Sequence, residues 1–253
     1  MINLLLGLLL LIIPVERRVY LIRSQMVEMG LTGIPNDLEV IVHPFQNKIA
    51  GQYNPYSHTL LLSDRFTRWL DQDNALILWI IVHELSHTNQ EIKDGPWGNF
   101  EQIAGGMTNS NYRSFMEGQN DLMTAIVMSD LYDYPVDNSI ALLLSDQQMM
   151  RDTGHSDGVA VVGYQAEAEI WAGIAVLGAT KYEVTPFQYL LDHHNNGFDG
   201  SAQLHLIMDL FPEHFQNGHF PAMAEIEDWL KEGRIDSYQA YRTMLVEGVQ
   251  DGR

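Results

Sequence analysis

The sequence predicts an α+β protein in which a small, mostly antiparallel sheet in the N-terminal part is followed by a mainly helical half. Two observations give this prediction. Three short runs between residues 38 and 62 have strand character, and most of the regular segments after residue 73 have helix character. With 253 residues, 46% of them hydrophobic, the chain is long enough to bury a core of ordinary size.

The N-terminal third is predicted to form one sheet with helices on either side of it in the sequence. In order, we expect a helix at residues 19–29, strands at 38–43, 48–52 and 59–62, and a short helix at 63–70. Gly30 closes the first helix, and Pro44 ends the first strand. Asn54, Pro55 and Ser57 supply turn residues between the second and third strands, so these two strands are expected to pair as a hairpin.

The C-terminal part is predicted to be helical, with polar breaks. Helices are expected at residues 163–178, 222–233 and 237–249, and the last two are amphipathic segments that would cover the core. Residues 93–113 are rich in Gly, Asn and Pro and are expected to cross the mouth of a cleft as a loop; residues 149–158 form a second break. His193 and His194 are expected in a loop, from which adjacent histidines cannot face one ion.

An apolar run at residues 4–13 marks the N-terminal end and stops at Pro14. It is too short to span a bilayer comfortably, and it lacks the basic start and small-residue cleavage site of a secretory signal. We expect residues 1–15 to be a hydrophobic segment, either packed on the domain or, as we favour, associated with a membrane through residues 2–15. The arginines that follow it would keep the bulk of the chain on the cytoplasmic side. A membrane-associated or cell-envelope location is favoured, a cytoplasmic one stays open, and residues 16–253 are expected to form a single domain.

The charge balance excludes one class of partner. The chain has 33 acidic and 14 basic residues, a net charge of −19, spread along the sequence. A protein that binds nucleic acid through its phosphates needs the opposite sign, so we expect no nucleic-acid partner. Cysteine is absent, which excludes disulfides, thiolate metal ligands and a cysteine nucleophile.

The sharpest motif is His83-Glu84-Leu85-Ser86-His87, which follows a long apolar run beginning at Ala75. The run predicts a buried helix, on which positions i and i+4 share one face. His83 and His87 can therefore bind one metal ion together. Glu84 lies about 100° further round the helix axis, beside the ion and close to the water that it would activate. These are the groups that metal-assisted hydrolysis requires.

The order of helix, strand, hairpin, short helix and H-E-x-x-H helix resembles that of zincin metallopeptidases. Residues 19–89, roughly a third of the chain, look most similar to the membrane-associated CAAX-protease and HtpX-type members. Within them only His83-Glu84-x-x-His87 is a sharp motif. The resemblance implies a zincin-like fold, one bound Zn²⁺, and an edge strand beside the cleft that can bind an extended substrate backbone.

A catalytic zinc site needs a third protein ligand and an open position for water. The metzincin pattern is excluded, because it requires Gly and His where this chain has Gln90 and Lys93. Residues 115–125 resemble the later helix of gluzincins, which supplies a glutamate. This resemblance makes Glu117 the predicted third ligand, and Asp121, one turn later, would orient a ligand histidine. The segment lacks the Asn-Glu of the thermolysin pattern and the Ala-Asp ending of the HtpX pattern.

A competing position for the third ligand lies at residues 165–169. On the HtpX pattern the ligand position falls on Gln165, a poor zinc ligand, and Glu167 would serve only in a shifted register. We expect the acids of this segment to lie exposed on a helix instead.

Together, these features predict a zinc metallopeptidase that acts on a protein or peptide substrate. His83, His87 and Glu117 would hold the ion, and Glu84 would be the general base. Two alternatives stay open: a binding or regulatory protein of the same fold with a structural metal, and a hydrolase of non-peptide amides.

Overall fold

The computed structural model describes residues 14–44, 51–54, 57–64, 75–90, 110–132, 165–196, 201–214 and 220–247. Nearly all of the predicted hydrophobic N-terminal segment lies outside these ranges. So do most of the short helix at 63–70, most of the loop at 93–113 and the whole break at 149–158. Among the described residues no helix is both long enough and apolar enough to span a membrane.

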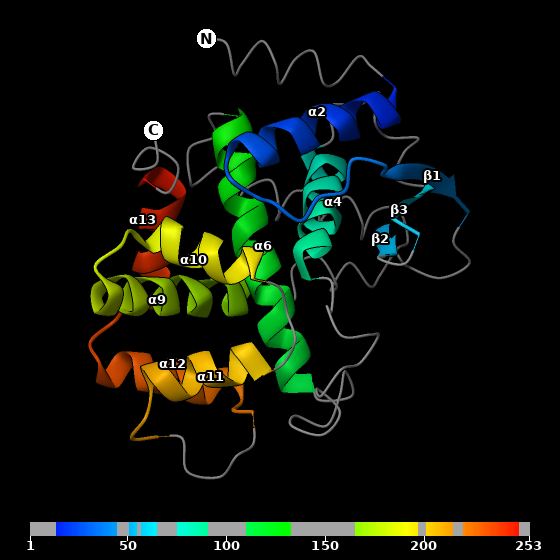
Figure 1. Cartoon of the computed structure of the whole chain (residues 1–253). Helices are drawn as coiled ribbons and strands as arrows, with labels where there is room; N and C mark the ends of the chain where they lie inside the picture. The colour runs from blue at the N-terminus through cyan, green and yellow to red at the C-terminus, as the bar shows by residue number, and fades with distance from the viewer. Residues whose placement is uncertain are drawn as a thin grey trace, which may run out of the picture. The chain divides into compact units, whose positions relative to one another are not determined.

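The described residues form an α+β structure that is mostly helical, as the sequence predicts (Figure 1). The three strands are β1 (Glu39–His43), β2 (Gly51–Asn54) and β3 (Thr59–Ser63). The helices of the N-terminal half are α2 (Val15–Glu28), α4 (Ala75–Ser86), the 3₁₀ turn η2 (His87–Gln90) and α6 (Ser110–Tyr132). Those of the C-terminal half are α9 (Gln165–Tyr182), α10 (Pro186–Asn195), α11 (Ser201–Leu210), α12 (Met223–Glu232) and α13 (Ser237–Glu247).

The chain divides into two compact units. The first comprises residues 1–88 and 123–163, and the second comprises residues 89–122 and 164–253. Helix α6 belongs to both, because the division falls within it, after Leu122.

In the first unit, helix α2 packs on α4, and α4 also contacts strands β2 and β3. Pro14 precedes the first turn of α2, so the helix begins earlier than the predicted residue 19. Its inner face buries Val19, Ile22 and Met26 completely, and each such side chain contributes about 1.5–3 kcal/mol by leaving water. Gly30 ends the helix, since its φ of 102° suits glycine and lets the next N–H bond back to the carbonyl of Met26.

The sheet is mixed rather than mostly antiparallel, which corrects the sequence prediction. Strands β2 and β3 form the predicted antiparallel hairpin, with Tyr53 opposite Leu60. Strand β1, however, pairs in parallel with β3, so that the strand order is β1-β3-β2. Side-chain alternation is the same in either orientation, which is why the sequence pattern did not distinguish them.

The second unit is built around helix α9, which contacts α10, α12 and α13 (Figure 1). Residues on all sides of α9 are buried, among them Ile170, Trp171 and Ile174. A helix that is apolar all round is a core helix, and its neighbours cover it with their amphipathic faces. The sequence prediction of helices at 163–178, 222–233 and 237–249 agrees with α9, α12 and α13.

One prediction in this unit was wrong. His193 and His194 do not lie in a loop but in the last turn of α10, which begins with a Thr185 cap and Pro186. Thr185 accepts a hydrogen bond from the N–H of Gln188, and proline is favoured in a first turn, so this helix has a strong start signal. Consecutive helix positions point about 100° apart, and His194 is fully buried.

Candidate metal centre

Helix α4 brings the two motif histidines together at its C-terminal end. Leu78 to Val82 are buried, and this apolar stretch anchors the helix beneath the rings. The helix tightens after Ser86 into η2, which contains His87. Two hydroxyls support this end, because Ser86 donates to the carbonyl of Val82 at 2.9 Å and Thr88 to that of Leu85 at 2.6 Å.

The facing nitrogens of the two rings are close enough to share an ion. Nε2 of His83 lies 3.1 Å from Nε2 of His87, and the rings meet edge to face at 81°. Two nitrogen ligands of a tetrahedral zinc ion, each about 2.0–2.1 Å from it, lie about 3.4 Å apart. This separation is therefore near the one that a shared ion requires.

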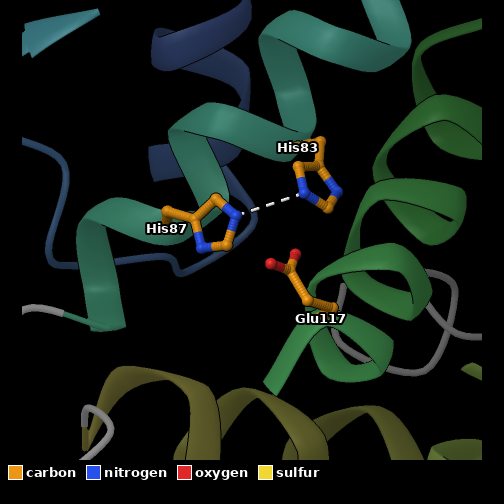
Figure 2. A group of neighbouring side chains, drawn as sticks. All are labelled: His83, His87 and Glu117. Atoms are coloured by element: carbon orange, nitrogen blue, oxygen red, sulfur yellow. Dashed lines mark hydrogen bonds between the residues drawn. The ribbon is translucent and has the colours of Figure 1, made fainter. Parts of the chain in front are cut away.

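The third member of the group is Glu117 of α6, which is only 9% exposed. One ligand atom from each of His83, His87 and Glu117 lies within 4.8 Å of the others. Figure 2 shows the Glu117 carboxylate pointing toward the two rings. The 4.8 Å limit exceeds the tetrahedral ideal by about 1.4 Å, a distance that side-chain torsions can cover. The donor set and its spacing thus fit one zinc ion.

Glu84 lies outside this group of three, and its role as a base stays a prediction. Its Oε2 accepts a hydrogen bond of 3.0 Å from the backbone N–H of Tyr53 in strand β2. Gly51 makes this approach possible. A methyl group there would lie 2.8 Å from both Cγ of Glu84 and Cγ2 of Ile80. The sequence prediction missed Gly51 and Tyr53, although glycine within a strand is a known sign of close approach by another element.

Helix α9 constrains the rotation of the first half of α6 about its helix axis. The α6 backbone at Gly118 lies against Glu167, where a Cβ on residue 118 would come within 2.5 Å of the Glu167 Cβ. One turn along α9, the indole N–H of Trp171 donates to the carbonyl of Phe115 at 2.6 Å. These two contacts constrain both the spacing and the rotation of α6, and hence the direction of Glu117. Neither contact was predicted from the sequence.

Asp121, the predicted partner of a ligand histidine, is 5% exposed and lies one turn after Glu117. Its charge reaches α9, since burial and, to a lesser extent, the Asp121 carboxylate raise the pKa of Glu167 above its ordinary value. Its role toward a histidine stays a prediction.

The competing acid, Glu167, does not join the three-residue group, and Gln165 instead donates to Glu169 at 3.2 Å. Glu167 was expected to be exposed, and this expectation was wrong. It is partly buried, and its Oε2 has no hydrogen-bond partner.

No protein-family model, no curated protein and no solved structure matches this chain. The resemblance to zincins therefore rests on the sequence pattern, and the grouping of His83, His87 and Glu117 is a separate, geometric observation.

Proposed function

We propose that this protein is a zinc-dependent metallopeptidase of the gluzincin type. His83, His87 and Glu117 would hold one Zn²⁺, and Glu84 would act as the general base. The observation that carries the proposal is the grouping of a helical histidine pair with a buried carboxylate from a distant part of the sequence, all within 4.8 Å. Two imidazoles and one carboxylate are the ligand set of catalytic zinc sites that keep a position open for water.

The reaction is hydrolysis of an amide bond. When bound, zinc at such a site polarises the carbonyl and lowers the pKa of a water molecule. The water oxygen adds to the carbonyl carbon, and the Glu84 carboxylate takes the proton that the water gives up. Glu84 then passes this proton to the amide nitrogen, so that the C–N bond breaks and a carboxylate and an amine leave. A peptide substrate follows from the resemblance of His83-Glu84-x-x-His87 to the zincin motif.

One contact is equally compatible with a second function, that of a binding protein in which the metal is structural. Glu84 is hydrogen-bonded to the Tyr53 N–H, and a glutamate with a purely structural role would make the same contact. The two functions differ in what Glu84 must do. A base has to accept a proton, whereas a structural anchor has only to accept a hydrogen bond.

Glu84→Gln separates the two functions, because the glutamine amide oxygen can accept the bond from Tyr53 but the side chain cannot act as a base. Zinc content and cleavage of a quenched-fluorescence peptide library and of denatured casein would be measured on purified wild type and variant. We expect full zinc content in both and cleavage by the wild type alone. Cleavage by Glu84→Gln at the wild-type rate would remove the base assignment. A zinc-loaded wild type that cleaves no peptide would favour the binding function, with small amides as the remaining substrates to assay.

A further inference from the structure

The carboxylate of Glu84 is held by the edge of a sheet. In the part of the sheet that the structure describes, β2 is an edge strand with β3 as its neighbour. The N–H and C=O of one residue point to the same edge of an antiparallel strand, and those of the next residue to the opposite edge. Since the Tyr53 N–H points at Glu84, the outward groups belong to Gly51 and Tyr53, while Gln52 and Asn54 face β3. The bond to Glu84 therefore takes no N–H away from the hydrogen bonds between β2 and β3.

The distance between helix and strand is set by the missing side chain of Gly51. Any Cβ at this residue would meet Ile80, which is buried and cannot move aside without disturbing the helix packing, and the Cγ of Glu84 itself. Helix α4 and strand β2 are in contact, so a larger residue would push the Tyr53 N–H away from the carboxylate. Gly51 and the Tyr53 N–H thus act together to position the Glu84 side chain.

A general base has to be held in one orientation. A glutamate has three side-chain torsions, and it loses rotational freedom only if something fixes the carboxylate. A backbone N–H within a sheet is a rigid donor, and its bond to a charged acceptor is among the stronger hydrogen bonds in proteins.

We infer that strand β2 is the positioning element for the general base, with Gly51 setting the approach and the Tyr53 N–H holding Glu84 Oε2. This inference rests on the proposed hydrolytic function. Gly51 and Tyr53 are positioning residues that act through Glu84. A misplacement of about 1 Å in a catalytic group can cost about 10²-fold in rate, so loss of this contact affects turnover rather than substrate affinity.

Tyr53→Pro removes the N–H and, because that group points away from β3, leaves the β2–β3 ladder intact. Tyr53→Ala is the matched reference, since it removes the side chain and keeps the N–H. On a peptide substrate cleaved by the wild type, we expect kcat of Tyr53→Pro to be about 100-fold below that of Tyr53→Ala, with equal KM and equal zinc affinity. Equal kcat values, or a rise in KM alone, would overturn the inference.

If Tyr53→Pro does not fold, Gly51→Ala takes its place. The added methyl group is expected to lower kcat to a similar extent at unchanged KM, and wild-type turnover in this variant would contradict the inference.

A second readout needs no activity. The quantity compared is the difference in unfolding midpoint between Tyr53→Pro and Tyr53→Ala in metal-free protein. This difference should be larger when Glu84 is present than in the Glu84→Ala background. Equal shifts would show that no such bond exists, whether or not the protein is a hydrolase. A wild type that binds no zinc and cleaves nothing would instead refute the proposed function itself.

Discussion

Nε2 of His83 and Nε2 of His87 face each other at 3.1 Å, one helical turn apart. In this contact only one of the two nitrogens can carry a proton, because two N–H groups that point at each other have no acceptor. A divalent ion between the rings would replace that proton and would require both rings to carry hydrogen on Nδ1 instead. If the pair binds one cation, as we propose, removing either ring should remove the site.

The first prediction is that His87→Ala abolishes high-affinity zinc binding. Loss of a group that merely hydrogen-bonds to a ligand costs about 10–100-fold in metal affinity, so loss of a ligand should cost more than about 100-fold. Competition with a chromophoric chelator would measure this affinity. The control is His205→Ala, which replaces an exposed histidine on α11 and should bind zinc as the wild type does. Equal affinities for both variants would place the ion elsewhere.

A second prediction concerns the α6–α9 contact. Gly118→Ala would place a methyl group 2.5 Å from the Cβ of Glu167 and 2.8 Å from its carbonyl carbon. The backbones have to separate, and overpacking of this kind costs about 1–3 kcal/mol of unfolding free energy. Urea unfolding of the metal-free protein would measure the loss. Gly233→Ala, where the new Cβ meets nothing closer than 3.3 Å, should be much less affected. A Gly118→Ala variant as stable as the wild type would contradict this close crossing.

Glu167 gives a prediction about pH. Burial, opposed by a backbone hydrogen bond and reinforced by the Asp121 charge, raises its pKa above the ordinary 4.5. The folded protein therefore keeps the proton to higher pH than the unfolded chain does. The stability that this proton contributes is fully present below pH 4.5 and is lost as pH rises through the raised pKa. Without metal, Glu167→Gln should unfold at a higher temperature than the wild type at pH 8, and at nearly the same temperature at pH 4.

The unfolding midpoints of Glu167→Gln and of the wild type would be measured at pH 4 and at pH 8. The midpoint difference between the two proteins is then compared at the two pH values, because the titrations of most other groups cancel in it. Glu213→Gln, at an exposed turn position, serves as the control. A difference for Glu167→Gln that stays constant across this range would show that Glu167 titrates alike in the folded and unfolded chain.

The local features of the site could be predicted from the sequence. His83 and His87 share a helix face because 3.6 residues make one turn, and this holds wherever the helix packs. The β2–β3 hairpin was likewise predictable from turn residues between two short strands. Glu117 was placed with these histidines by resemblance to the gluzincin helix, and the structure brings the three together.

The contacts that hold the site depend on long-range packing, and no local pattern encodes them. The Tyr53–Glu84 bond joins residues 31 positions apart, and the Trp171–Phe115 bond joins residues 56 apart. In each, a side chain bonds to a backbone group, so one partner leaves no signature in the sequence. The parallel pairing of β1 was missed for a similar reason. Strand alternation specifies a buried face but not a direction.

The central claim, that one ion is bound by two imidazoles of one helix and a carboxylate of another, is tested most directly by zinc stoichiometry in Glu117→Ala. Wild type, Glu117→Ala and Glu167→Gln would be loaded with zinc, dialysed and analysed for metal. Glu167→Gln is the matched variant, because Glu167 is the acid that competed for the same role in the sequence. We predict one zinc per chain in the wild type and in Glu167→Gln, and well below one in Glu117→Ala. One zinc per chain in Glu117→Ala together with its loss in Glu167→Gln would contradict the claim and make Glu167 the third ligand.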